Sequence, residues 1–362
     1  MLLAPSQAEC QSWVEACKKS QKGIENKKEK KGQKFQADGI CLDDFNLVLV
    51  LGRGKYGKIQ LVQCKRDGEL YAMKEIYQKF LETEQIEQII TERNVLLKAR
   101  HPFLVALHHT FQTPRKIYLI LEYVPGKELF SHLKDDSRFS EQRTVLYAAE
   151  ILLGLGYLHK LGFIYRDLCS ENILVDKDGH LKITCFSLAS FCCWYSPEYI
   201  APEMLQQQKC TRAVDWWSYG TLVYEMLTGL PPFYDENTQK MYQMILKEHV
   251  VFPSYVSEVA KDLITKLLDK NPATRLGASE EDVEEIKRHP FFSSLNWNDV
   301  LEKRYTPEWV PEIRNETDMD YTSDYVCFPD ELAVTFEDDT NMLDQQEFVG
   351  FTCGNDVMFD DI

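Results

Sequence analysis

The sequence predicts an α+β fold, and three observations lead to this class. Two apolar runs, Phe45 to Leu51 and Ile59 to Val62, flank a glycine-rich turn, which is the pattern of two strands joined by a turn. A further strand is expected at Leu70 to Lys74, and a helix from about Glu82 to Ala99 follows it. A long apolar helix is expected later in the chain, from Ala213 to Leu227.

The glycine-rich turn contains Gly52, Gly54 and Gly57, and Ile59 begins the next strand. This spacing fits the pattern G-x-G-x-x-G-x-V, with isoleucine in place of valine. The motif alone is weak evidence, because an ordinary hairpin also uses glycine. The dinucleotide-binding version of the motif requires a helix to follow, whereas a strand is expected here.

Three further motifs follow in order. Leu70 to Lys74 matches V-A-I-K, residues 165–172 match H-R-D-x-x-x-x-N, and residues 201–203 match A-P-E. Together with the glycine-rich turn, they stand at the spacing of the eukaryotic protein kinases, and the chain resembles that family over about residues 45–292. The resemblance implies two lobes: a small lobe with an antiparallel sheet and one main helix, and a larger, mostly helical lobe.

Other segments resemble the AGC group of serine/threonine kinases, and they are Tyr165 and residues 196–200, 213–217, 288–292 and 348–353. Residues 293–362 are similar to the C-terminal extension of this group. Its end looks like the hydrophobic motif of protein kinase B, protein kinase C and the serum/glucocorticoid-regulated kinases. Cys353 replaces the last aromatic residue of that motif, so we expect weaker docking on the small lobe. Thr352 is a candidate phosphorylation site, and another kinase is an expected partner of this tail.

The resemblance implies an ATP cleft with magnesium as the usual metal. Lys74 would contact the phosphates and pair with Glu92, Asp167 would accept the substrate's hydroxyl proton, and Asn172 would hold a metal. Leu121 would be the gatekeeper beside adenine. Main-chain groups of Glu122 and Val124 would contact adenine. The expected nucleotide-binding residues are Gly52, Gly54, Gly57, Ile59, Ala72, Lys74, Glu122, Val124 and Leu174.

The sequence departs from the family at the phosphates. Cys185 stands where kinases carry the aspartate that holds Mg²⁺, and this metal prefers carboxylate ligands to thiols. Cys169 stands where the AGC group has a lysine, two residues after Asp167. Ser187 replaces a glycine, and the segment from Cys185 to Glu203 is about ten residues shorter than in the group.

These departures favour a catalytically impaired, pseudokinase-like protein that binds ATP and basic peptides and acts as a signalling scaffold or regulator. The alternative is an active serine/threonine kinase with an atypical metal site, built from Asn172, Asp167 and an acid such as Glu171. A third hypothesis is a redox sensor that uses Cys169 and Cys185, although no Cys-x-x-Cys pair or neighbouring base supports a lowered thiol pKa.

Three acidic residues match the positions that select arginine in peptide substrates, and they are Glu128, Glu171 and Glu225. Exposed glutamates are common on protein surfaces, so three of them are limited evidence. Two structural pairings are also expected: Glu203 with Arg275, and Asp215 with the backbone of the catalytic loop. Both would survive the changes at the phosphates.

Residues 1–35 contain one apolar stripe, formed by Cys10, Trp13, Val14 and Cys17 at helical spacing. This short helix is similar to the last helix of a pleckstrin-homology domain, and an isolated amphipathic helix is an equal alternative. Five lysines between residues 27 and 34 follow it, which indicates a flexible basic linker. The alternative is a basic patch of only five charges that contacts a membrane surface.

The formal net charge of the chain is −16, and the C-terminal tail carries most of it. Residues 315–362 contain fourteen acidic residues and no lysine or arginine, so the rest of the chain is close to neutral. This distribution argues against nucleic acid as a partner. No apolar run reaches the length of a transmembrane helix. The eleven cysteines have no regular spacing, which favours reduced thiols and a cytoplasmic location.

Overall fold

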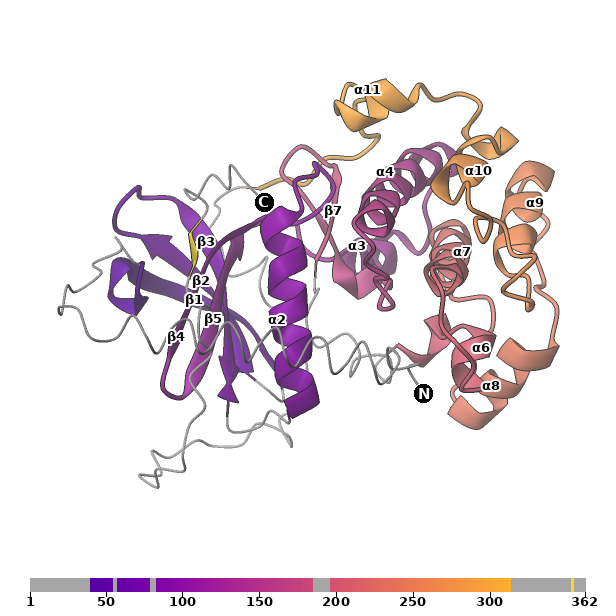
Figure 1. The fold of residues 1–362 in the computed structure, drawn as a ribbon. Coiled ribbons are helices and arrows are strands. Elements are labelled where there is room, and N and C mark those ends of the chain that lie inside the picture. The colour runs from indigo at the N-terminus through magenta and orange to yellow at the C-terminus, as the bar shows by residue number, and fades with distance from the viewer. Residues whose placement is uncertain (1–39, 55–56, 79–82, 185–195, 314–352, 355–362) are drawn as a thin grey trace. The chain divides into compact units, whose positions relative to one another are not determined.

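The computed structural model describes residues 40–54, 57–78, 83–184, 196–313 and 353–354 (Figure 1). Within these residues, the small lobe contains a short 3-10 helix, η1, together with six strands and one helix. Its elements are η1 (Leu42–Asp44), β1 (Phe45–Gly54), β2 (Gly57–Cys64), β3 (Leu70–Tyr77), α2 (Thr83–Lys98), β4 (Leu107–Thr113), β5 (Lys116–Glu122) and β8 (Cys353–Gly354). The predicted α+β class with a small sheet lobe and a larger helical lobe is confirmed.

The strands form one antiparallel sheet in the order β1-β2-β3-β5-β4-β8. Helix α2 contacts the sheet at β4. One face of the sheet carries a buried cluster that includes Phe45, Val62, Met73, Tyr118 and Ile120. Because side chains alternate along a strand, the residues between these positions point to the opposite face of the sheet.

The large lobe is mostly helical. Its elements are α3 (Leu129–Asp136), α4 (Glu141–Lys160), η3 (Ser170–Asn172), β6 (Ile173–Val175), β7 (Leu181–Ile183), η4 (Pro197–Tyr199), α6 (Pro202–Leu205), α7 (Ala213–Thr228), α8 (Thr238–Lys247), α9 (Glu258–Leu267), α10 (Val283–Lys287), η5 (Pro290–Phe292) and α11 (Trp297–Leu301). None of the helices in the described part of the chain is both long and apolar enough to cross a membrane.

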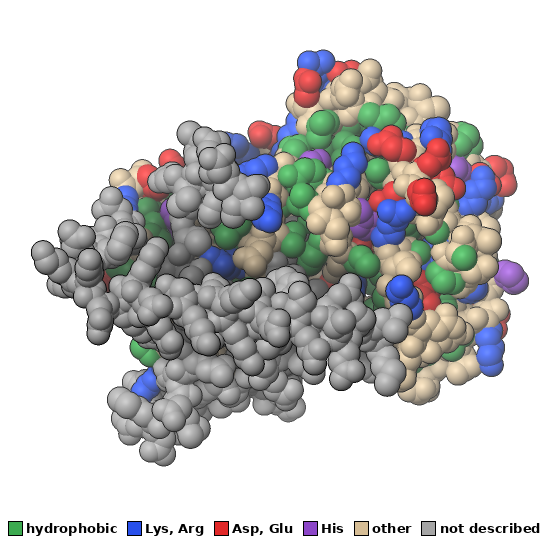
Figure 2. Space-filling view, in the orientation of Figure 1, with side chains coloured by type: hydrophobic (Ala, Val, Ile, Leu, Met, Phe, Trp, Pro, Cys, Tyr) green, Lys and Arg blue, Asp and Glu red, His purple; other side chains and the backbone are tan. Residues whose placement is uncertain are grey.

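Helix α7 is the centre of this lobe. Every residue from Ala213 to Leu227 is buried, and α7 packs against α4 and α9. A helix that is buried on all sides, as α7 is, must be surrounded by other elements of the protein. The helix ends at Thr228, and Gly229 caps it with a φ of 91°, a conformation that favours glycine. On the face seen in Figure 2, acidic and basic side chains are interspersed over the helical lobe.

Both expected structural pairings are present. Arg275 donates from Nη1 to Glu203 Oε1 at 2.6 Å and from Nη2 to Oε2 at 2.8 Å, and both side chains are almost fully buried. The buried carboxylate of Asp215 accepts hydrogen bonds from the backbone N–H groups of Tyr165 and Arg166, at 2.8 and 2.6 Å. The side chains of Cys41, Cys64, Cys169 and Cys210 are free thiols.

Several sequence predictions lie outside the described residues. These are the amphipathic helix and basic linker of residues 1–35, the residues Cys185 and Ser187, and the candidate phosphorylation site Thr352. The end of the predicted hydrophobic motif is described only as β8, which pairs through its backbone with β4. In that pairing Cys353 lies opposite Thr110, and Gly354 lies opposite His109.

Candidate active site

The register of the small sheet places the expected cleft residues on one face. Ile59 on β2 lies opposite Lys74 on β3, and Ala72 lies opposite Leu121 on β5. Directly opposite residues in antiparallel strands share a face, and Ala72 and Lys74 share one because they are two residues apart. This face is opposite the one that carries the buried cluster around Met73.

The glycine-rich turn connects β1 and β2. Gly52 lies opposite Ile59, and Gly54 lies opposite Gly57, where the two strands pair. A Cβ atom added to Gly57 would lie 1.7 Å from the backbone oxygen of Glu75. The close approach of β3 therefore requires glycine at this position whether or not a nucleotide binds.

An apolar cluster lies at the hinge that follows β5. Val105, Val124 and Leu174 are buried together, and Leu121 packs against them. Val124 and Leu174, two of the expected adenine-binding residues, are fifty positions apart in the chain. The fold brings them together with Leu121, the expected gatekeeper. An apolar cluster of this kind fits the flat faces of a purine ring.

The side chain of Glu122 connects the hinge to β7. Its carboxylate accepts from Lys182 Nζ at 2.9 and 3.0 Å and from the backbone N–H of Ala106 at 3.2 Å. Sequence analysis did not identify this link, because the two charged residues are sixty positions apart and belong to no common motif. Lys182 precedes the Cys185 position by three residues, so the link fixes the strand that leads to it.

The catalytic loop is held in a strained conformation. Arg166 has a φ of 68°, which is unfavourable for a residue with a side chain. The two hydrogen bonds to Asp215 hold the backbone there. Within the loop, Asn172 Nδ2 donates to the backbone oxygen of Asp167 at 2.8 Å and to its Oδ2 at 2.9 Å. The predicted catalytic residues Asp167 and Asn172 are therefore in direct contact.

Burial raises the pKa of Asp167 to about 7. The residue is only 8% exposed. The nearby charge of Glu171 raises the pKa further, whereas the hydrogen bond from Asn172 and the charge of Lys74 lower it. The carboxyl group is therefore partly protonated at neutral pH. A general base is most effective with a pKa near the working pH, so this value is compatible with a residual catalytic role.

Cys169 is buried in the hydrophobic core of the large lobe. Burial raises the pKa of its thiol well above the usual value, and the charges of Glu171 and Asp167 act in the same direction. The side chain is therefore a neutral thiol at physiological pH, and it offers no positive charge to a phosphate. Because the thiolate is the reactive form of cysteine, this environment also argues against the redox-sensor hypothesis.

The three acidic residues expected to bind basic peptides differ in exposure. Glu128 precedes α3 and Glu171 lies in η3, and both are partly exposed. Glu225 on α7 is buried, accepts a hydrogen bond from Tyr199 OH, and lies 3.5 Å from Ser170 Oγ. Burial raises its pKa to about 7. The contact between Tyr199 and Glu225 was also missed from the sequence, because these residues are 26 positions apart.

The remaining expected residues lie as follows. Glu92 lies on α2, and its pairing with Lys74 stays a prediction. Among the residues that the structure describes, no group of three or more His, Cys, Asp or Glu side chains could hold a metal ion. Asn172 donates to Asp167 through its side-chain nitrogen, Nδ2. The side-chain oxygen of Asn172 is then the atom that would bind a metal.

Comparison with known proteins decides the family. The model of the protein kinase domain matches residues 45–292. The chain belongs to the protein kinase family. It is 40% identical to the "RAC family serine/threonine-protein kinase homolog" of Dictyostelium discoideum, in an alignment that covers 97% of this chain and 80% of the relative.

Other similar kinases carry names from the AGC group. The chain is 44% identical to human "Serine/threonine-protein kinase Sgk2", over 80% of this chain and 84% of the relative. It is also 44% identical to chicken "Serine/threonine-protein kinase Sgk1", over 76% of this chain and 66% of that relative. The kinase therefore belongs with the AGC serine/threonine kinases, as the motifs predicted.

Proposed function

We propose that this kinase-family protein binds ATP and basic peptides but transfers phosphate slowly, and that it acts in signalling as a scaffold or regulator. The observation that carries the proposal is the buried, neutral thiol of Cys169, two residues after Asp167. The positive charge that the AGC group has there is absent. The replacement of the metal-binding aspartate by Cys185 in the sequence supports the same conclusion.

Nucleotide binding is supported by the residues of the cleft. Ile59, Ala72 and Lys74 share a face of the sheet, and Val124 and Leu174 form an apolar cluster with Val105. These residues fit the adenine ring and a negatively charged phosphate. The magnesium site is not supported to the same degree, since a thiol stands in place of its carboxylate ligand.

The size of the expected defect can be estimated. Loss of one electrostatic group that acts in the transition state typically lowers the rate by about 10²–10³. Loss of both a metal carboxylate and a cation would lower the rate by roughly 10⁴ or more. The two factors are not simply multiplied, because effects at one site are not independent. From kinase turnovers of about 1–100 s⁻¹, one transfer every few minutes to hours would remain.

The decisive experiment restores both groups. We expect the wild-type chain to phosphorylate an arginine-containing peptide at no more than about 10⁻² s⁻¹, and the double variant Cys169→Lys/Cys185→Asp to be at least a hundredfold faster. Adding Asp167→Asn to that variant should abolish the gain. Wild-type turnover in the ordinary kinase range would disprove the proposal.

Nucleotide binding can be tested separately through the melting temperature with ATP, with and without Mg²⁺. A ligand at 100 times its Kd stabilises a protein by about 2.7 kcal/mol, which corresponds to several degrees. We expect a shift that does not need magnesium and that is lost in Lys74→Met. No shift under either condition would leave only peptide or protein binding.

An active kinase with an atypical metal site is the second candidate function. The direct hydrogen bonds between Asn172 and Asp167 favour it, because the catalytic loop keeps an ordered arrangement. In this case the metal would use Asn172, Asp167 and an acid such as Glu171. A melting shift that requires Mg²⁺, together with peptide phosphorylation that Asp167→Asn abolishes, would favour this alternative.

A further inference from the structure

A charged pair connects the two lobes at the hinge. Glu122 is the last residue of β5 in the small sheet, and Lys182 is the middle residue of β7 in the large lobe. Lys182 Nζ lies 2.9 Å from Oε1 and 3.0 Å from Oε2 of Glu122, so the ammonium group contacts both carboxylate oxygens. The Lys182 side chain is only 12% exposed. Because charges that are shielded from water interact more strongly than exposed ones, this contact restrains how the two lobes meet.

The carboxylate of Glu122 is also held from the small lobe. The backbone N–H of Ala106, just before β4, donates to Oε2 of Glu122 at 3.2 Å. In return, the backbone N–H of Glu122 donates to the backbone oxygen of Ala106 at 2.8 Å. The side chain and the backbone of Glu122 therefore share one neighbour, and the orientation of the carboxylate is coupled to the position of the hinge backbone.

The other end of the pair is fixed by strands of the large lobe. Lys182 lies opposite Leu174 where β6 and β7 pair. The next residue, Ile183, donates through its N–H to the oxygen of Phe103 at 2.9 Å and accepts from the N–H of Val105 at 3.0 Å. Leu174 belongs to the apolar cluster that fits adenine. The charged pair thus connects the hinge to the strands that form one wall of the expected adenine site.

Glu122 has two separate tasks in this arrangement. Its main chain is an expected contact of adenine, whereas its side chain binds Lys182. We propose that Lys182 is a positioning residue of the nucleotide cleft: it holds the Glu122 carboxylate and thereby keeps the hinge backbone at the distance from Leu174 that an adenine ring requires. This inference rests on the proposed nucleotide binding and adds a residue that contacts no part of the nucleotide.

The link acts on the empty cleft. Without it, the hinge and the strand that carries Leu174 would occupy several relative positions. The affinity for a ligand falls in proportion to the fraction of molecules in the competent arrangement, and an ordered site loses less conformational freedom on binding. We therefore expect loss of the link to weaken ligands that contain adenine by roughly three- to tenfold.

Calorimetric titration of the full chain with ATP and with adenosine tests this role. Lys182→Met removes the charge at similar length and should weaken both ligands by the same factor, because the effect passes through the adenine contact. Lys182→Arg keeps the charge and should bind both ligands nearly as the wild type does. Unchanged binding of both ligands in Lys182→Met would overturn the proposal. A loss confined to ATP would also overturn it, because it would show that Lys182 attracts the phosphates.

Glu122→Gln tests the other half of the pair and keeps the experiment valid if Lys182→Met does not fold. It leaves the main chain unchanged and should weaken both ligands as Lys182→Met does. The double variant should lose no more affinity than either single variant, because both changes remove the same interaction. Losses that multiply in the double variant would show that the two residues act separately, against the proposal.

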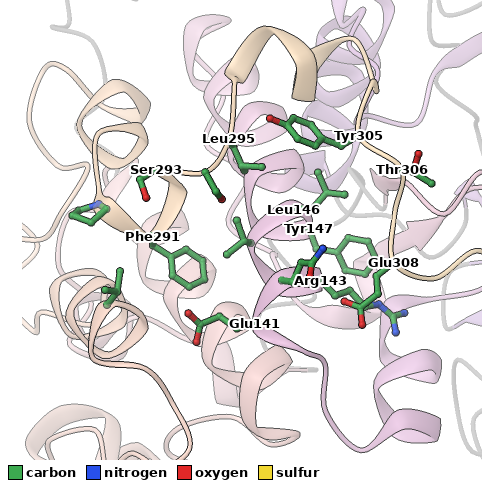
Figure 3. A pocket seen from close by; sticks show the side chains of 15 residues that line it. Glu141, Arg143, Leu146, Tyr147, Phe291, Ser293, Leu295, Tyr305, Thr306 and Glu308 are labelled. Atoms are coloured by element: carbon green, nitrogen blue, oxygen red, sulfur yellow. The ribbon is translucent and has the colours of Figure 1, made fainter.

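Glu141→Gln is the matched control, since it makes the same chemical change at a distant site. Figure 3 shows Glu141 among the side chains that line a different cavity, with Leu146 and Phe291. The Glu141 carboxylate accepts a hydrogen bond from Ser257 Oγ at 2.8 Å, and none of the expected nucleotide-binding residues lines that cavity. This variant should bind ATP and adenosine as the wild type does.

The same titrations separate this inference from the proposed function. If the wild type binds neither ATP nor adenosine, nucleotide binding is wrong and the positioning role falls with it. If the wild type binds both and Lys182→Met binds them equally well, only the positioning role is wrong. Melting temperatures of the ligand-free variants complete the test. A lower melting temperature with unchanged affinity in the folded protein would mean that the pair serves stability alone, which contradicts the proposal.

Discussion

At the scale of single residues, Asp167 and Cys169 stand two positions apart, and burial raises the pKa of both. A lysine near the catalytic aspartate would favour its ionised form. With a buried thiol in that place, burial dominates and the pKa of Asp167 rises to about 7. The residue at position 169 thus decides the charge available to a phosphate, and we expect it to affect the protonation of Asp167 as well.

We predict that Cys169→Lys lowers the pKa of Asp167 towards its ordinary range, because the ammonium group stabilises the carboxylate. Titration of the carboxyl group by NMR would measure this change. Cys169→Met is the matched control, since it enlarges the side chain without adding a charge, and it should leave the pKa near 7. The same pKa in the lysine and methionine variants would contradict the electrostatic explanation.

A second prediction concerns pH and stability. The pKa of Asp167 is about 7 in the folded protein and about 4 in the unfolded chain, so the folded state holds a proton that the unfolded state releases between these values. The free energy of unfolding therefore falls as pH rises from about 4 to 7 through this group. Asp167→Asn removes the effect and should stabilise the protein by about 2–4 kcal/mol at pH 8, and far less at pH 5.

Urea denaturation at pH 5 and pH 8 would test this expectation. Asp178→Asn is a suitable control, because Asp178 is exposed and lies only eleven positions after Asp167. Its effect should be small and equal at both pH values. Equal stabilisation by Asp167→Asn at pH 5 and pH 8 would show that protonation of Asp167 is not the cause.

At the scale of elements, the cleft depends on close contacts between backbones. The pairing of β2 with β3 places Lys74 on the same face as Ile59, and it brings the backbone of Glu75 against Gly57. The catalytic loop is likewise fixed through its backbone, since Asp215 accepts from the N–H groups of Tyr165 and the strained Arg166. In both places, backbone contacts of neighbouring residues position the side chain that is predicted to act at the site.

We predict that Gly57→Ala destabilises the protein by at least about 2–3 kcal/mol, because the added methyl group collides with the Glu75 carbonyl and separates β2 from β3. Thermal unfolding monitored by circular dichroism would measure the loss. Gly68→Ala is the control: it has a φ of 78° but open space around it, so only backbone strain of about 1–2 kcal/mol is expected. Equal effects of the two substitutions would rule out the steric explanation.

At the scale of the whole molecule, the large lobe has the framework of an ordinary kinase. Arg275 and Glu203 form two hydrogen bonds in a fully buried site, and Arg275 also donates to the backbone oxygens of Ala213 and Asp269. This set of bonds connects α6, the start of α7 and the segment after α9. The buried side chain of Arg275 thus holds three segments of the large lobe together.

Breaking this pair should destabilise the lobe strongly. We predict a loss of about 3–5 kcal/mol for Arg275→Met, because Glu203 then remains as a buried charge without its partner. Chemical denaturation of Arg275→Met, Glu203→Gln and the double variant would measure the coupling. The double variant should lose less than the sum of the two single changes, and strictly additive losses would contradict a direct interaction.

Much of the fold could be predicted because its signals are local. The glycine turn, the strand with Lys74, the helix at α2 and the apolar α7 each show in a few consecutive residues, and their order indicated the two lobes. The substitutions Cys169 and Cys185 were equally visible, since a motif fixes the type of residue expected at each position. The family could therefore be identified before any contact was known.

Other properties depend on contacts between distant parts of the chain, and only the folded structure revealed them. The links Glu122–Lys182 and Tyr199–Glu225 join residues 60 and 26 positions apart. The protonation of Asp167 and Cys169 is set by burial, and burial is a property of the whole assembled lobe. A sequence pattern specifies which groups are present, whereas their exposure and partners fix their charge and reactivity.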